Sequence, residues 1–488
     1  MVPSSPWSWP LSWRIAILLN VSFYNMLGNM YASGVSPLFE LIIKDFHCTQ
    51  QQASELTTYV LLTLGLSNLF AIPLASLIGK RYTILLSLVL FLATNIWSGE
   101  APSYTSLLVS RILGGLAGGL VEALGPTIVA ETFPKHQWAR AMVVYVGFLA
   151  AGSALGPIIA GAIAHGVGDW RWYQRILAIA VAVNLLGSIL MLPETTHDSM
   201  DINGSALVED GDTDSKAGAA VNEFASGSGQ ELNPPDDGSL SQNLREEWVK
   251  RSFSTQYVSM DWEAALLSFV KPLQLIALPQ VVVTTLVFGL TIGWTVIIAV
   301  ILAVVYAPPP LLWSSLHVGL LSLAPLTGLL IGLPVGGALA DMLFNRHQKK
   351  SQQVHDPAVR LPAVIIGGLV SPAGCLVLGY GLQHPHTWIQ VCVGWAMLAF
   401  GLTGSANVLL TYAVDSLPAR AGDIGTLLNV TKNSLGFGVS YASVSWMQKS
   451  GTANQFATMA GLLWFCYLLV IPLWLYRAAL VRLTTRWY

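Results

Sequence analysis

Residues 279–306 read PQVVVTTLVFGLTIGWTVIIAVILAVVY, and this stretch decides the fold class. It contains no Asp, Glu, Lys, Arg or His. A helix that spans the hydrocarbon core of a bilayer takes roughly 20 apolar residues, and this run is longer than that. Because the bilayer core holds no water, only helices and closed barrels satisfy the backbone there, and runs of this length indicate helices. The stretch is therefore predicted to be a transmembrane helix.

Further apolar segments of similar length lie on both sides of this stretch. They are 14–38, 53–78, 82–98, 103–130, 138–165, 172–192, 317–342, 361–383, 388–412, 424–447 and 456–479. Six of the resulting twelve segments precede a long polar segment, and six follow it. The sequence thus predicts an all-α membrane protein with 12 transmembrane helices in two six-helix bundles.

The composition supports this class and excludes others. Of the 488 residues, 53% are hydrophobic and 10% are Asp, Glu, Lys or Arg, whereas soluble proteins carry about 25% charged residues. A soluble enzyme and a nucleic-acid-binding protein are both excluded, and the net charge of −2 indicates no charged partner. The 4 cysteines are scattered without metal-ligand spacing, so neither a metal site nor a disulfide framework is predicted.

The polar segment divides the chain. We predict an N-terminal tail at 1–13, a first bundle at 14–192, a linker at 193–272, a second bundle at 273–479 and a C-terminal tail at 480–488. The first part of the linker is acidic and then rich in Gly, Ser, Asn and Pro, with too little apolar surface to fold, so the linker is expected to be largely disordered.

Lys and Arg predict the orientation, because they are concentrated in cytoplasmic loops. With the N-terminus in the cytoplasm, the basic residues of the outer segments are only Lys44, Arg171, Arg175 and Lys449. Arg111 and Lys432 lie inside spans, and all other Lys and Arg residues fall on the inner side. Both termini and the linker are therefore predicted to be cytoplasmic.

The two halves share short motifs. The segment 131–141 reads ETFPKHQWARA and the segment 415–421 reads DSLPARA, so each has an acid, a Pro three residues on and an Arg-Ala pair. Parallel repeats of six helices are a transporter architecture that binds its substrate between the halves, near the membrane midplane. Three further stretches are notable: 111–119 (RILGGLAGG), 152–161 (GSALGPIIAG) and 337–341 (GALAD).

With these motifs the chain resembles the major facilitator superfamily, in particular the twelve-helix drug:proton antiporter-like transporters of fungi. The first-half copy of the loop motif, 76–81 (SLIGKR), has Ser76 where that family usually has Asp. The resemblance implies a monomeric plasma-membrane carrier that exports small organic compounds, such as drugs and secondary metabolites, in exchange for protons. It implies no ATP use, cofactor or metal, and neither a Walker A loop nor a hydrolase motif is present, so no enzyme activity is expected.

Two charged residues of one predicted span are candidates for proton coupling. Arg111 and Glu122 are eleven residues apart, which places them on one helix face about 16 Å from each other. A charge in lipid is costly and usually faces a cavity or a partner. Glu122 would bind and release the proton, and Arg111 would adjust how readily it does so. The alternative is that Glu122 is hydrogen-bonded packing.

Polar residues within other spans are candidates for a substrate cavity. They are Asn25, Asn29, Asn407, Asn429, Lys432 and Asn433. The last three share one helix face, where they would contact a polar or anionic substrate. Alternatively, Lys432 extends to the inner membrane surface, and the first two asparagines clamp neighbouring helices.

A third set is predicted to control gating. Gly152, Gly156, Pro157 and Gly161 form a stripe of small residues with a kink, which lets another helix approach closely. Five charged residues at cytoplasmic helix ends, together with Lys80 and Arg81, would form ion pairs between the halves that keep the inner side closed in the outward-open state: Glu131, Arg140, Asp341, Asp415 and Arg420. The alternatives are ordinary packing and surface charge that only sets topology, since exposed pairs contribute about 0–1 kcal/mol.

Two other functions stay open from the sequence. The first is a proton-coupled importer of a nutrient or an organic cation, which would have similar motifs. The second is a transporter-like nutrient sensor that signals through the linker and carries no flux.

Overall fold

A computed structural model describes residues 9–195, 262–350, 357–384, 386–417 and 420–484 of the chain. Within these ranges all regular structure is helical. The tail at 1–8, most of the predicted linker (196–261) and the tail end at 485–488 lie outside the described residues. At the end of the predicted linker, Trp262–Gln274 forms helix α11, which packs on α3 and α18.

Six long helices build the first half of the chain. They are α1 (Leu11–Ser33), α3 (Gln50–Ile78), α4 (Lys80–Gly99), α5 (Tyr104–Thr132), α6 (Lys135–Val167) and α7 (Arg171–Met191). The short helix α2 (Phe39–Phe46) connects the first two of these helices, with the turn Ser36–Leu38 before it. A capping box starts α3: the Thr49 hydroxyl accepts from the backbone N–H of Gln52, whose side chain accepts from the backbone N–H of Thr49.

The second half repeats this plan with more interruptions. Its crossing segments are α12 (Pro279–Tyr306), α13 (Ser315–Leu320) with α14 (Leu323–Lys350), α15 (Val364–Gln383), α16 (Trp388–Gly401) with α17 (Asn407–Ser416), α18 (Ala421–Ser450) and α19 (Thr452–Leu468) with α20 (Val470–Leu475). A 3-10 turn at Pro357–Ala363 precedes α15, and α21 (Arg477–Thr484) ends the described chain. The π-helical segment Leu402–Ala406 joins α16 to α17.

Ten of these segments are long and apolar enough to cross a membrane. The remaining two crossing helices are α1, of 23 residues, and α18, of 30 residues. Both are less apolar because they carry buried polar side chains, among them Asn25 and Lys432. A helix surrounded by protein needs less apolar surface than one that faces lipid. Twelve crossing segments in two sets of six confirm the predicted all-α membrane fold.

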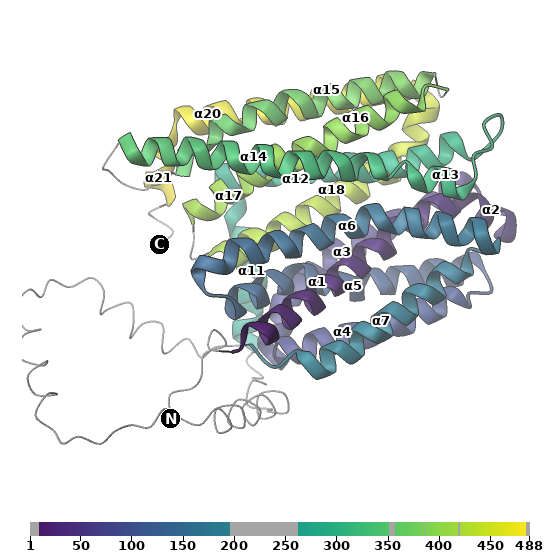
Figure 1. Ribbon diagram of the computed structural model, residues 1–488, viewed down its shortest axis with the longest axis horizontal. Coiled ribbons are helices and arrows are strands. Elements are labelled where there is room, and N and C mark those ends of the chain that lie inside the picture. The colour runs from purple at the N-terminus through teal and green to yellow at the C-terminus, as the bar shows by residue number, and fades with distance from the viewer. Residues whose placement is uncertain (1–8, 196–261, 351–356, 385, 418–419, 485–488) are drawn as a thin grey trace, which may run out of the picture.

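The two bundles lie side by side with their helices nearly parallel (Figure 1). The start of α1 and the helix α21 lie at one end of the molecule, which we call the terminal end, and α2 and α13 lie at the opposite, distal end (Figure 1). Contacts between the bundles run through α3 with α18, α5 with α18, and α6 with α13. The outer surface is apolar: Ile179, Leu369 and Phe465 are 64%, 62% and 60% exposed, as lipid contact requires.

Candidate functional site

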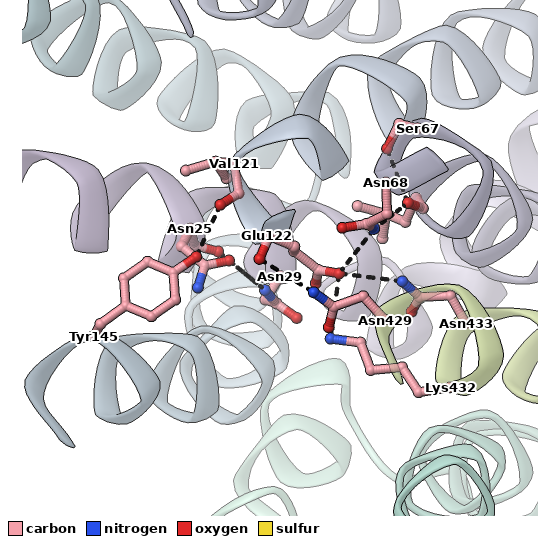
Figure 2. Close-up of polar contacts among 11 residues, drawn as sticks. Asn25, Asn29, Ser67, Asn68, Val121, Glu122, Tyr145, Asn429, Lys432 and Asn433 are labelled. Carbon is pink, nitrogen blue, oxygen red and sulfur yellow. Dashed lines mark hydrogen bonds and ion pairs between the residues drawn. The ribbon is translucent and has the colours of Figure 1, made fainter. Parts of the chain in front are cut away.

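A buried ion pair joins the two bundles near the centre of the molecule. The Lys432 ammonium on α18 lies 3.2 Å from Oε2 of Glu122 on α5, and the two side chains are 4% and 2% exposed. Figure 2 shows Lys432 and its neighbours on α18 approaching Glu122 from the opposite bundle. Sequence analysis placed both residues in spans but did not pair them.

Three amides complete the surroundings of this carboxyl group. Asn433 and Asn68 donate to Oε2 of Glu122 at 3.1 and 3.4 Å, and Asn429 donates to its backbone carbonyl at 3.1 Å (Figure 2). A buried ion pair is tolerated when hydrogen bonds satisfy its remaining polar atoms. The predicted shared face of Asn429, Lys432 and Asn433 is therefore present, and all three residues contact Glu122.

Glycines bring the helices close enough for these contacts. A Cβ at Gly119 of α5 would lie 2.7 Å from the carbonyl oxygen of Leu64 on α3, so only a glycine allows the two helices to approach this closely. A Cβ at Gly65 of α3 would lie 2.9 Å from Cβ of Asn433. The small residues of 111–119 thus hold α5 against α3 and direct Glu122 toward α18.

Arg111 does not lie beside Glu122. Its guanidinium donates to the backbone carbonyls of Leu56, at 2.9 Å, and Tyr31, at 2.8 Å, and it stacks 4.4 Å from the centre of the Tyr31 ring. These contacts tie α5 to α1 and α3. Helical spacing predicted Arg111 about 16 Å away from Glu122 along the same helix. The cation in contact with Glu122 is Lys432 of the second bundle.

A cavity of about 110 Å³ lies between the bundles next to the ion pair. Asn29 and Thr57 of the first bundle line it, together with Trp395, Lys432 and Asn433 of the second. Asn29 donates to the backbone carbonyl of Asn25 at 3.0 Å and contacts its side-chain oxygen at 3.4 Å. The remaining lining is largely aliphatic, so the cavity has a mixed character suited to an organic molecule.

Three predicted cavity residues lie apart from this lining, and one of them is Asn429, which donates to the backbone carbonyl of Glu122 instead. Asn25 is fully buried behind Asn29, and its amide nitrogen has no partner within the described residues. Asn407 lies on α17, where its carbonyl accepts a hydrogen bond from Thr411 at 2.9 Å. The structure therefore groups Asn29, Lys432 and Asn433 at the cavity and leaves Asn407 outside its lining.

The predicted small-residue stripe of α6 makes contacts of two kinds. Gly152 and Gly156 face α1 of the same bundle. A Cβ at Gly152 would lie 2.4 Å from the Met26 carbonyl oxygen, and a Cβ at Gly156 would lie 2.8 Å from the Ser33 hydroxyl. At Gly161 a Cβ would lie 2.3 Å from the carbonyl of Ser315 on α13, in the other bundle.

The bundles also meet tightly around this point at the distal end. A Cβ at Gly319 of α13 would lie 2.4 Å from the carbonyl of Pro157. The hydroxyls of Thr58 and Ser440 share a hydrogen bond of 2.8 Å between α3 and α18. The bundles are therefore closed against each other at the distal end.

The described ion pairs at the terminal end lie within single bundles in this arrangement, which is closed at the distal end. Glu131 pairs with Lys80 within the first bundle, and Asp415 pairs with Arg360 at 2.5 Å within the second. Arg420 pairs with Asp423 at 3.3 Å on the same helix. These pairs do not join the two halves, because each acid finds a cation on its own bundle.

The other two predicted gating residues, Arg140 and Asp341, form no ion pair among the described side chains. Arg140 is exposed on α6. Asp341 lies on α14, but its side chain is outside the described part of the chain.

Sequence analysis missed two contributors to these clusters. Glu194 is 2% exposed and accepts hydrogen bonds from the backbone N–H groups of Lys80, at 3.3 Å, and Arg81, at 3.0 Å, which caps the start of α4. The other is Asn68, whose only signal in the sequence is a single amide within the apolar run 53–78. Neither contact follows from helical spacing, since both join separate helices.

Comparisons with known proteins agree with this architecture. A sequence profile of the Major Facilitator Superfamily matches residues 18–441. The chain is 22% identical to the MFS antiporter QDR3 of Candida albicans, with 93% of this chain and 76% of that protein covered. It is also 22% identical to the cycloheximide resistance protein of Candida maltosa, and that alignment covers 85% of this chain and 70% of the other protein.

Solved structures share the fold. The crystal structure of a D-xylose-proton symporter superposes on this chain with a TM-score of 0.62 and 16% sequence identity. The superposition covers 93% of this chain and 97% of the symporter chain. The family profile, the two six-helix bundles and the cavity between them lead to one assignment. The chain belongs to the major facilitator superfamily and is a secondary transporter.

Proposed function

We propose that this protein exports small organic molecules in exchange for protons, by alternating access of the cavity between its bundles. The observation that carries the proposal is the buried pair of Glu122 and Lys432. Glu122 is a titratable group, it lies next to the cavity lining, and its partner belongs to the opposite bundle. One group is thus in a position to bind the proton and to influence how the bundles meet.

The electrostatics of the pair suggest how coupling works. With Glu122 ionised, its attraction to Lys432 favours contact between α5 and α18. When Glu122 takes up a proton, the Lys432 ammonium is left buried without a counter-charge, which is strongly unfavourable. Protonation therefore favours an arrangement in which the bundles separate and water reaches Lys432. Proton binding and cavity opening are coupled through this one contact.

The roles of other residues follow from their places. Asn29 and Asn433 line the cavity and are proposed to contact the cargo. Gly161 and Pro157 are proposed to close the distal end by packing on α13. We assign Arg111 a positioning role, since it holds α5 against α1 and α3.

Relatives and basic residues support the direction and the location. The relatives described above include an antiporter and a drug-resistance protein, which favours export over import. The bias of Lys and Arg toward the terminal end favours cytoplasmic termini and an outward-facing distal end. Location in the plasma membrane is part of the same proposal. The division into bundles at 14–192 and 273–479, with 193–272 as linker, belongs to the same proposal, as does a monomeric state.

The test uses inside-out vesicles from fungal cells that express the full chain. Labelled cycloheximide is the first probe. If the vesicles do not accumulate it, the metabolites of cells with and without the protein are compared, and a compound retained in cells without the protein is used as the cargo. We expect accumulation under an inside-acid gradient. In Glu122→Gln the gradient-driven accumulation falls to the level of vesicles without the protein, because no proton is exchanged. Exchange of labelled for unlabelled cargo persists, since it needs no net proton movement.

The matched control is Glu40→Gln, which removes a carboxylate from the surface pair of Glu40 and Lys44 on α2. This variant keeps wild-type accumulation. Accumulation under the opposite gradient would indicate import instead of export. Full gradient-driven transport by Glu122→Gln would exclude Glu122 as the coupling group.

A further inference from the structure

The hydrogen-bond donors that line the central cavity differ in whether they have an acceptor within the protein. Most of them are already occupied by protein acceptors. The hydroxyls of Ser33, Ser36, Ser153 and Thr295 each donate to a carbonyl of their own or the preceding helical turn, and the Asn29 amide donates to Asn25. Lys432 and Asn433 are both directed to Glu122. None of these groups needs a ligand in order to be satisfied.

Two lining donors differ from all of these. Trp395 on α16 is 3% exposed and Thr57 on α3 is 2% exposed. The indole N–H of Trp395 and the hydroxyl of Thr57 have no hydrogen-bond partner among the described residues. Buried donors without partners are rare in native proteins, and a donor that lines a cavity can be satisfied by water or by a ligand within it. The two come from opposite bundles and line one cavity.

The charge of the lining residues indicates which net charge a ligand in the cavity can carry. Among the described residues that line the cavity, Lys432 carries the only charge, and Glu122 neutralises it from behind. No carboxylate faces the cavity there, so a ligand cation would meet no counter-charge. The walls between the two donors are apolar, with Leu61, Val296 and Leu329 among them.

We infer that the cavity selects uncharged, mainly apolar molecules that carry hydrogen-bond acceptors of the carbonyl or ether type. The Trp395 N–H and the Thr57 O–H donate to these acceptors and determine specificity. Because the two donors belong to different bundles, one ligand with two acceptors would contact both halves. This inference rests on the proposed function for the role of the cavity, and it names the class of cargo.

The experiment measures binding, and it requires no transport. Three naphthalene probes of similar size are used with the purified full chain in detergent, by equilibrium dialysis. These probes are 2-acetylnaphthalene, which carries a carbonyl acceptor, 2-ethylnaphthalene, which lacks one, and (2-naphthylmethyl)trimethylammonium, a cation. The quantity of interest is the ratio of the dissociation constants of the ketone and the hydrocarbon, because partition into micelles cancels between variants.

Trp395→Phe and Thr57→Val remove one donor each; the second keeps nearly the same shape, and the first has a smaller aromatic ring, which the Trp294→Phe control matches. Because the ketone carries one carbonyl, we expect at least one of the two variants to raise this ratio about three- to tenfold, the effect of losing one neutral hydrogen bond. The hydrocarbon should bind to both variants as it does to the wild type, which also shows that they fold. The cation should bind more weakly than the ketone throughout.

The controls are Trp294→Phe and Thr63→Val. Trp294 is buried outside the cavity lining, and the Thr63 hydroxyl donates to Val60 at 3.1 Å, so neither change should move the ratio. An unchanged ratio in both donor variants, stronger binding of the cation than the ketone, or no binding of either uncharged probe would overturn the inference. The dialysis uses no proton gradient, so a failure of proton coupling in the vesicle experiment stays distinguishable from a failure of this inference.

Discussion

At the scale of single residues, the decisive contact joins side chains that are far apart in the chain. Glu122 meets Lys432 across the two bundles, and Asn68, Asn429 and Asn433 contact the same glutamate. Burial makes each charge depend on the other, because water is not there to replace the partner. The cluster is therefore more sensitive to the loss of one charge than to the loss of both.

This sensitivity gives a prediction for stability. Lys432→Met leaves the Glu122 carboxylate buried without its counter-charge and should lower the free energy of unfolding by about 3–5 kcal/mol. The double variant Glu122→Gln with Lys432→Met should recover most of this loss. Thermal unfolding of the purified protein in detergent at neutral pH provides the measurement. Equal melting temperatures for the single and double variants would mean that the two charges do not interact.

At the scale of the elements, small residues decide which helices approach each other. The stripe on α6 changes partner along its length, from α1 at Gly152 and Gly156 to α13 at Gly161. Its first part packs one bundle, and its last part closes the distal end between bundles. The same motif thus packs α6 on α1 and on α13, and the contact with α13 is where the proposed gating role would act.

Substitutions along α6 should separate these roles. Gly161→Val places a side chain against the Ser315 carbonyl and should disfavour the distal-closed arrangement by about 1–3 kcal/mol, the usual cost of overpacking. Transport in vesicles should fall while the folded protein is still recovered as a single peak in gel filtration. Gly166→Val is the control on the same helix, since a Cβ there meets nothing within 4 Å. Equal transport by both variants would contradict a gating role for Gly161.

At the scale of the whole molecule, the contacts described above place the bundles in one of the arrangements that alternating access requires. They are in contact at the distal end, through α6 with α13 and through Thr58 with Ser440. The described ion pairs of the terminal end stay within single bundles and do not hold the halves together. The distal contacts must break if cargo is to leave on that side.

Locking the distal end tests this requirement. In a chain whose 4 native cysteines are replaced by alanine, Thr58→Cys and Ser440→Cys should form a disulfide on oxidation, because the two hydroxyl oxygens lie 2.8 Å apart. The oxidised protein should lose transport and regain it on treatment with a reductant. The single variant Thr58→Cys should be unaffected by either treatment. Full transport by the cross-linked protein would mean that the distal end does not open there.

Much of the fold was predictable from runs of apolar residues. The bilayer forces each run to satisfy its own backbone, so a span such as 279–306 is helical whatever its neighbours are. The stripe of Gly152, Gly156 and Gly161 predicted close helix packing, and the polar face of Asn429, Lys432 and Asn433 was visible from helical periodicity. Helix α11 and the π-helical segment Leu402–Ala406 were not predicted, since their sequences lack a distinguishing pattern.

The amino-acid sequence by itself thus determined a membrane protein of two six-helix sets, because hydrogen bonding in lipid is satisfied locally within each helix. The tertiary structure alone decided that Lys432, and not Arg111, lies beside Glu122, and that Glu131 and Asp415 pair within their own bundles. It also decided that Trp395 and Thr57 present unoccupied donors to one cavity. These contacts depend on how distant helices rotate and pack against one another, and spacing along one helix carries no information about that.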